Sequence, residues 1–258
     1  MTAIKLAFET YGDSANQPLI ILHGFFASSR NWRQIAKKLA DYYHIYVIDL
    51  RNHGLSPHSP EMDYPVMAAD LNLFMDEQGL QTASIMGHSM GGKVAMWFAL
   101  NNPQKIQKLI VADISPVGYQ HSFDKTIHAL KSLPLDKISN RKQADAYLAT
   151  DIAELSYRQF LLQNLHLKDG HYCWRVDLDI FKQTADNIIA FPSIDLISPF
   201  VDEILFIMGE NSTYMNVHAI DAYFPNAKIA VLEGANHWLH VDKPEEFCVT
   251  VLEFLKKE

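Results

Sequence analysis

The sequence predicts an α/β fold in which a mostly parallel, twisted sheet is covered by helices on both faces. Short apolar runs alternate with amphipathic helical patterns along most of the chain, which is the order typical of parallel strands joined by crossover helices. The runs are apolar at successive positions rather than at every second one, as expected of strands that are buried on both faces. A chain of 258 residues is long enough to build this sheet around one large core.

Short apolar runs define the predicted strands, and helical periodicity follows most of them. The first helix begins near Ser29 and places Trp32, Ile35 and Leu39 on one face. Proline is favoured in the first turn of a helix, so Pro65 indicates the start of a second one. The predicted strands are 19–22, 44–49, 83–87, 108–113, 204–208 and 228–232, and the later helices are 65–78, 91–101 and 244–256.

The strand and helix alternation stops after Asp113 and resumes only at Ile204. The roughly 85 residues between them are far too long for a connecting loop, which is usually about 2–6 residues in such folds. Helical patterns fall near 125–133, 141–154 and 156–165. We therefore expect a core made of residues 1–115 and 199–258, with a helical cap inserted at residues 116–198.

Composition and charge exclude several classes of protein. The chain is 48% hydrophobic and 20% charged, which excludes disordered and collagen-like chains. Its 22 basic and 30 acidic residues give a net charge of −8, and this balance argues against a nucleic-acid partner. Cys173 and Cys248 are the only cysteines; they form neither a disulfide framework nor a metal-site spacing, and they favour a reducing compartment.

Targeting and membrane signals are not visible in the sequence. Residues 1–11 lack the basic start and apolar segment of a secretory signal. No run approaches the about 18 apolar residues that a membrane helix needs. We therefore expect a cytoplasmic protein without a membrane partner, and we leave open whether it is a monomer or a dimer.

The segment Gly87-His88-Ser89-Met90-Gly91 matches the pattern of a nucleophile elbow. In this sharp turn between a strand and a helix, a strained backbone exposes the serine hydroxyl, and small residues are needed two positions before and after it. An apolar run precedes the segment and a helical pattern follows it. The pattern therefore predicts Ser89 as a nucleophile.

Such a nucleophile needs backbone N–H groups that bind the oxyanion formed during attack. Met90 follows the serine and is expected to supply one of them. His23-Gly24-Phe25-Phe26 comes directly after an early strand, and we expect the second donor to be the N–H of Phe25.

A serine at neutral pH also needs an adjacent base. Of the 12 histidines, His237 stands directly after the last predicted strand, where a loop can reach Ser89. His240 in the same segment is the competing candidate. No pair of histidines has the spacing of a metal-binding helix, so a metal site is not expected.

Five stretches together resemble the α/β-hydrolase family, and within it the small bacterial esterases of the YbfF type. The resemblance runs nearly from end to end and is weakest between residues 119 and 198. It implies hydrolysis of carboxylic esters or thioesters without a cofactor. The stretches are His23-Gly24-Phe25-Phe26, Asp49-Leu50-Arg51-Asn52-His53-Gly54-Leu55-Ser56, Gly87-His88-Ser89-Met90-Gly91-Gly92, Asp113-Ile114-Ser115-Pro116 and Gly234-Ala235-Asn236-His237-Trp238.

The acid of the triad is the point at which the chain departs from the commoner family pattern. Most relatives carry an aspartate after the strand that reads 204–208 here, and this chain has Ser212 at that position. Glu210 and Asp113 are the available carboxylates. The resemblance to the YbfF-type group implies Asp113 as the acid, with Ser212 in a supporting hydrogen bond to the Asp113–His237 pair.

These residues predict a serine hydrolase acting on small esters or thioesters with short to medium acyl chains. Phe26, Trp174 and Trp238 are the expected pocket residues. Basic residues near Arg141 and Lys142 leave acyl-CoA thioesterase activity open as the main function. The same fold also carries out carbon–carbon bond hydrolysis and can serve as a catalytically silent ligand receptor, so both of these functions stay open as well.

Overall fold

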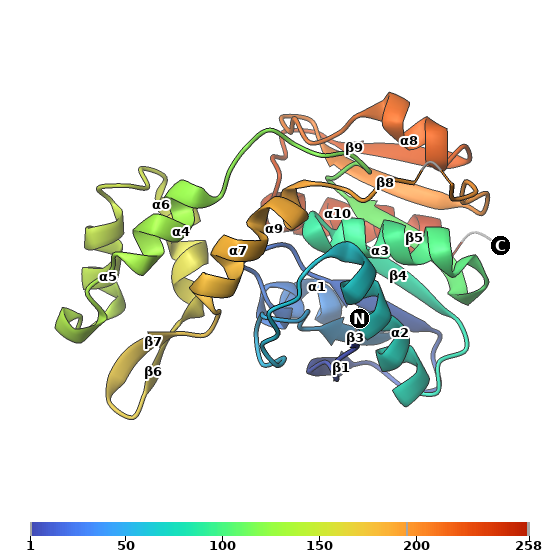
Figure 1. The fold of residues 1–258 in the computed structure, drawn as a ribbon. Helices are drawn as coiled ribbons and strands as arrows, with labels where there is room; N and C mark the ends of the chain where they lie inside the picture. Colours follow the sequence, from blue (N-terminus) through green and yellow to red (C-terminus); the bar gives the residue numbers. More distant parts are fainter. Residues whose placement is uncertain (1, 195, 257–258) are drawn as a thin grey trace.

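The computed structural model describes residues 2–194 and 196–256. Its main feature is a seven-stranded sheet in the order β1-β3-β2-β4-β5-β8-β9 (Figure 1). Neighbouring strands are parallel except β1, which pairs antiparallel with β3. The strands are β1 Phe8–Tyr11, β2 Pro18–Leu22, β3 His44–Ile48, β4 Ala83–His88, β5 Ile106–Ala112, β8 Ile204–Gly209 and β9 Ala227–Leu232.

Alternate residues of the central strands bury into two separate cores, so both faces of the sheet are covered. Leu19 and Ile21 of β2 pack in the core that includes α1 and α10, whereas Ile20 and Leu22 pack in the core that includes α2 and α3. The predicted mostly parallel α/β sheet with helices on both faces is therefore confirmed. These helices are α1 Arg33–Leu39, α2 Tyr64–Glu77, α3 Met90–Asn101 and α10 Pro244–Leu255, and two further helices are α8 Val217–Tyr223 and α9 Leu239–Asp242.

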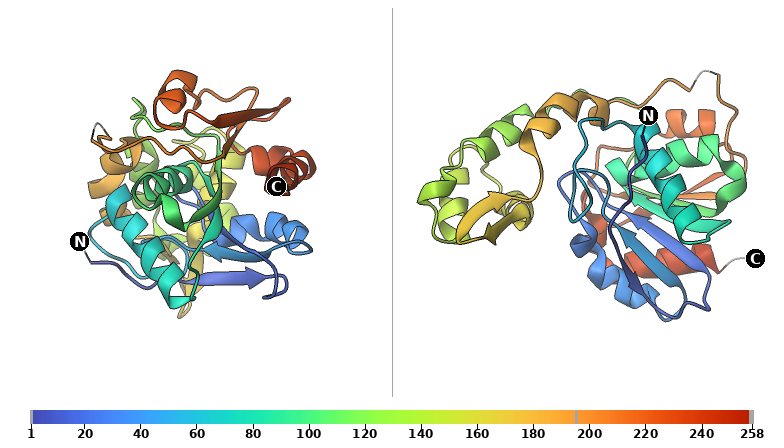
Figure 2. Two further views of the ribbon diagram at one scale, coloured as in Figure 1. Left: turned by 90° about the vertical axis from the view of Figure 1, so that its right-hand side faces the viewer. Right: turned by 60° about the horizontal axis from the view of Figure 1, so that its bottom comes forward.

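Between β5 and β8 the chain leaves the sheet and forms a lobe on one side of it (Figure 1). The turned view shows the lobe extending away from the sheet, with α7 leading back toward it (Figure 2, right). We use the name cap for residues 116–198, as defined from the sequence. Its elements are α4 Asp124–Lys131, α5 Arg141–Leu148, α6 Leu155–Leu161, β6 Leu165–Lys168, β7 His171–Trp174 and α7 Leu178–Ile189.

The cap contains an antiparallel hairpin, β6–β7, which the sequence interpretation placed partly in a helix and otherwise left unassigned. The two residues between these strands, Asp169 and Gly170, both have positive φ, at 50° and 81°. An Asp-Gly pair with two positive φ angles is a preferred two-residue hairpin turn. The signal for the hairpin was therefore present in the sequence. The helices predicted at 141–154 and 156–165 are also shorter, since they end at Leu148 and Leu161.

Candidate active site

Ser89 lies at the sharp turn between β4 and α3. Its backbone has φ 52° and ψ −119°, a strained conformation that the neighbouring glycines make possible. A Cβ atom on Gly87 would lie 2.2 Å from the carbonyl oxygen of Gly91, and one on Gly91 would lie 2.4 Å from that of Leu22. No side chain fits at either position, which explains the small residues on both sides of the serine.

The Ser89 side chain is half-buried and lines a cavity of about 930 Å³. His237 lines the same cavity. Among the described residues, no hydrogen bond reaches the Ser89 hydroxyl. The elbow is therefore held by its backbone, including the Ser89 N–H that donates to the Ala112 carbonyl at 3.1 Å, and the hydroxyl remains available to a ligand.

The loop after β2 presents its backbone to the same cavity. The Phe26 N–H donates to Nε2 of His53 at 3.2 Å, whereas the Phe25 N–H has no acceptor among the described residues. Met90 is the first residue of α3, and N–H groups in the first turn of a helix lack a partner within the helix. Phe25 and Met90 both line the cavity that Ser89 lines. Two unpartnered N–H groups of this kind can receive a developing negative charge.

Asp113 and His237 lie in direct contact. Asp113 follows β5 with a positive φ of 54°, and its fully buried carboxylate accepts a hydrogen bond from Nδ1 of His237 at 2.8 Å. The N–H of Gly209 donates to Oδ1 at 3.0 Å, and the Ser212 hydroxyl donates to Oδ2. A carboxylate held this way fixes the ring orientation of the histidine and favours its Nδ1–H tautomer. That tautomer leaves Nε2 unprotonated and able to accept a proton.

The competing candidates have other contacts. Glu210 accepts a hydrogen bond from the N–H of Gly234 at 2.8 Å. His240 is buried and stacks on Trp32 with ring centroids 4.1 Å apart, and burial holds its pKa well below the ordinary value.

His88 donates from Nε2 to the backbone oxygen of His237 at 2.9 Å, and burial lowers the pKa of His88 to about 3. His88 therefore stays neutral at physiological pH and holds the backbone of His237.

Two of the three pocket residues expected from the sequence line the cavity. Phe26 and Trp238 do so, and Trp238 packs on Phe160 of α6 with ring centroids 5.3 Å apart. The expectation for Trp174 is wrong, because this residue is outside the cavity wall. Its indole N–H donates to the Leu130 carbonyl of α4 at 3.2 Å. Trp174 is thus part of the internal packing of the cap.

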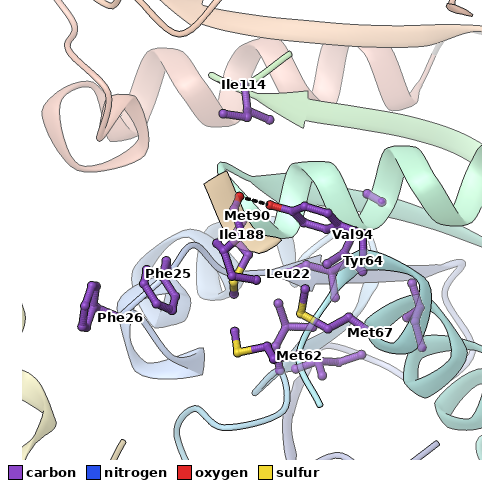
Figure 3. Close-up of a cluster of buried hydrophobic side chains, with 14 of the residues drawn as sticks. Leu22, Phe25, Phe26, Met62, Tyr64, Met67, Met90, Val94, Ile114 and Ile188 are labelled. Carbon is purple, nitrogen blue, oxygen red and sulfur yellow. Dashed lines mark hydrogen bonds between the residues drawn. The ribbon is translucent and has the colours of Figure 1, made fainter. Parts of the chain in front are cut away.

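Several residues of the site were not found by sequence reasoning. The Tyr214 ring stacks on His237 with centroids 4.2 Å apart; its place two residues after Ser212 was the available signal. Lys93 of α3, Tyr64 of α2 and Tyr119 also line the cavity. Figure 3 shows Tyr64 bonded to Ile188 of α7, so the core and the cap meet at this wall. Nothing in the local sequence around these residues indicates that the core and the cap are in contact there.

In the part of the chain that the structure describes, no group of three or more histidine, cysteine, aspartate or glutamate side chains could hold a metal ion. Across residues 2–194 and 196–256, no helix has both the length and the apolar character needed to cross a bilayer.

Comparison with known proteins identifies the family. The model of the alpha/beta hydrolase fold family matches residues 17–244. The chain belongs to this family, and the family resemblance expected from the sequence is confirmed.

Individual relatives narrow this to hydrolases of the esterase and lipase group. The chain is 38% identical to the mouse (Mus musculus) sn-1-specific diacylglycerol lipase ABHD11 over 255 residues, which cover 95% of this chain and 82% of the mouse protein. It is 35% identical to esterase YbfF of Escherichia coli (strain K12), with 93% of each chain covered. A solved structure described as a marine microorganism esterase has a TM-score of 0.92 and 41% identity, covering 98% of this chain and 100% of that one. The chain is therefore a hydrolase related to esterases and lipases.

Proposed function

We propose that the protein is a serine hydrolase that cleaves small carboxylic esters or thioesters through an acyl-enzyme on Ser89. His237 is the base and Asp113 the acid of the triad. The observation that carries the proposal is the 2.8 Å contact between His237 Nδ1 and the Asp113 carboxylate, in a cavity that His237 shares with a serine held in a strained turn. The proposal includes the cytoplasmic location suggested by cysteine usage.

The mechanism follows from the chemistry of these groups. Nε2 of His237 takes the hydroxyl proton as Ser89 Oγ attacks the acyl carbon, and Asp113 stabilises the imidazolium that forms. The N–H groups of Phe25 and Met90 receive the oxyanion. His237 then gives the proton to the leaving alcohol or thiol. Water, activated by the same imidazole, cleaves the acyl-enzyme and restores the Ser89 hydroxyl.

The cavity supports an apolar acyl group of short to medium length. Its volume is about 930 Å³, within the usual size range of small-molecule sites. Aromatic side chains from the core and the cap share its wall, among them Phe25, Phe26, Phe123, Tyr157, Phe160 and Trp238. We propose that residues 116–198 form a cap that encloses the substrate over the core.

Replacing Ser89 with alanine tests the nucleophile. We expect kcat for a p-nitrophenyl ester to fall about 10⁵- to 10⁶-fold, as for other triad knockouts, with the fold retained. A fluorophosphonate probe should label the unmodified protein at Ser89, as located by peptide mass spectrometry. Labelling at another residue, or an active Ser89→Ala variant, would contradict the mechanism. A protein that folds but turns over no ester would instead be a ligand receptor.

A second cavity favours acyl-CoA thioesters as an alternative main substrate. It has a volume of about 550 Å³, and three cationic side chains line it: Arg30 of the core, and Arg141 and Lys142 of α5. It shares Gln159 and Gln163 with the wall of the main cavity, so a long leaving group could extend from one into the other. Arginine and lysine are the usual partners of phosphate groups.

Neutralising two of the three cations of this second cavity separates the two substrate classes. The double variant Arg141→Gln/Lys142→Gln should raise KM for an acyl-CoA by about tenfold or more, because each lost contact to a charged phosphate weakens binding. KM for a p-nitrophenyl ester of the same acyl chain should change far less. Lys168→Gln removes an exposed lysine of the hairpin and is the matched control. An equal change in KM for both substrates would count against a phosphate site.

A further inference from the structure

Lys93 is the one fully buried lysine among the described residues, with 1% of its surface exposed. It lies on α3, one helical turn after Ser89. Its Nζ donates to the carbonyl oxygens of Ile189 and Ala190, each at 2.8 Å. The same atom lies 4.7 Å from the centre of the Tyr119 ring and 5.6 Å from that of Tyr64.

This ammonium group has no anionic partner. Among the described residues, no carboxylate forms an ion pair with Lys93. Burying an unpaired charge is unfavourable, and burial lowers the pKa of Lys93 to about 7. An ammonium can donate three hydrogen bonds, and the two backbone carbonyls use two of them. A further donor and the missing countercharge both remain for a ligand.

The position of Lys93 relates it to the candidate active site. Lys93 and Ser89 line the same cavity, and so do Tyr64, Tyr119 and Ile189, which surround Nζ. Four residues correspond to a rise of about 6 Å along a helix, and residues at this spacing share one face. Long side chains in helices lean toward the N-terminus, which for Lys93 is the direction of Ser89.

Holding the end of α7 does not by itself account for a charged side chain here. The Tyr64 hydroxyl of α2 donates to the Ile188 carbonyl, and the Tyr119 N–H donates to the Ile189 carbonyl at 3.2 Å. The end of this helix therefore already accepts hydrogen bonds from two other donors, one in the core and one in the cap, and neither of them buries a charge.

We propose that Lys93 is a substrate-binding residue that pairs with a carboxylate carried by the ester, a few atoms from the bond that is cleaved. The inference rests on the proposed function and adds a negative charge to the substrate class. The carboxylate can belong to the acyl part or to the alcohol part of the ester, and substrates of both kinds distinguish these sources.

Two matched pairs of esters measure the preference for charge. Monoethyl glutarate carries a carboxylate on the acyl part, and ethyl isoheptanoate replaces it with an isopropyl group of similar shape. β-Butyryloxypropionate carries a carboxylate on the alcohol part, and isopentyl butanoate is its neutral counterpart. The ratio of kcat/KM for the charged ester to that for the neutral ester is measured for each pair. Differences that affect both esters equally cancel in this ratio.

The Lys93→Met variant should lower that ratio at least about tenfold for one pair, because a hydrogen bond between two charged groups is lost. Lys93→Arg keeps the charge and should restore a large part of it. Lys37→Met, which removes an exposed lysine of α1, is the control and should leave the ratio unchanged. If Lys93→Met lowers kcat/KM for both esters of each pair by the same factor, Lys93 only supports the structure and the proposal is overturned.

The unmodified protein gives a second test that does not depend on the folding of a variant. Lys93 is protonated below its pKa of about 7, so the ratio should be highest near pH 6 and should fall as the pH rises to 9. The other titratable groups near Nζ do not change charge over most of this range. Burial raises the pKa of Tyr119 to about 12 and that of Tyr64 well above its ordinary value. Burial and the charge of Lys93 lower the pKa of His121 below its ordinary value.

The outcomes separate this inference from the proposed function. A ratio that stays constant with pH in both pairs and is also unchanged in Lys93→Met overturns the role of Lys93, even if both esters are cleaved. If neither the neutral nor the charged esters are cleaved, and a p-nitrophenyl ester is not cleaved either, the proposed function itself fails. Cleavage of all esters by Ser89→Ala would have the same meaning.

Discussion

The residues that follow two neighbouring strands share a positive φ angle, yet their side chains are positioned in different ways. Ser89 after β4 and Asp113 after β5 have φ angles of 52° and 54°, a region that costs a residue other than glycine about 1–3 kcal/mol. The Ser89 hydroxyl has no hydrogen bond among the described residues. The Asp113 carboxylate accepts one from each of Gly209, Ser212 and His237.

The difference shows how each group is positioned. The turn alone directs Ser89, because the glycines around it pack too closely for any side chain. Contacts from the loop after β8 and from His237 fix Asp113. Substitution of the Asp113 carboxylate should therefore disturb both the orientation and the charge of His237. Substitution of a residue that donates a hydrogen bond to Asp113 should have a smaller effect on His237.

Asp113→Asn gives the largest expected effect on the acid side. An amide in place of the carboxylate favours the wrong imidazole tautomer, and the corresponding change in a serine protease lowered kcat by about 10⁴-fold. We expect a decrease of several orders of magnitude in kcat for a p-nitrophenyl ester. The melting temperature should change little, because the amide retains the size of the carboxylate.

Glu210→Gln is the matched control, since it makes the same chemical change at the other carboxylate considered from the sequence. Glu210 contacts the N–H of Gly234 rather than His237, so its kcat should stay close to that of the unmodified protein. A large loss in Glu210→Gln beside an active Asp113→Asn would place the acid after β8 instead.

Ser212→Ala gives a smaller effect at the same place. It removes one hydrogen bond to Asp113, and a hydrogen bond to a charged group contributes roughly 1.5–3 kcal/mol, or about 10- to 150-fold in kcat. Thr213→Val removes the hydroxyl of the next residue, which is exposed, and should have almost no effect. If the two variants behave alike in a steady-state assay, the contact from Ser212 has no part in holding the acid.

The parts of the site that could be predicted are those for which local sequence determines local geometry. The elbow is such a case, because its glycines and serine occupy five consecutive residues. Local sequence did not identify the acid, because Asp113 and Glu210 were both available. Only the resemblance to the YbfF-type esterases favoured Asp113. His237 could be placed because a loop after the last strand of a parallel sheet reaches the edge where the other strands end.

The parts that could not be predicted depend on contacts between distant segments. Lys93 has the sequence context of an ordinary helix residue, and it is buried by distant segments, among them the end of α7 and the rings of Tyr64 and Tyr119. Lys93 was missed, whereas Trp174 was wrongly expected in the cavity wall. Its large apolar side chain suggested a pocket residue, yet it packs inside the cap. Apolar character predicts burial, and it does not tell which of several apolar spaces a side chain enters.

The close contact between Gly91 and the carbonyl oxygen of Leu22 has a consequence for protein engineering. It joins the start of α3 to the end of β2, so the turn that carries Ser89 and the loop that carries Phe25 tolerate little change in volume. Another part of the cavity wall is built from cap residues, including Tyr157 and Phe160, which pack on Trp238 rather than on the elbow. Libraries that aim at new substrates should therefore vary this wall, where a change of shape leaves the reacting groups in place.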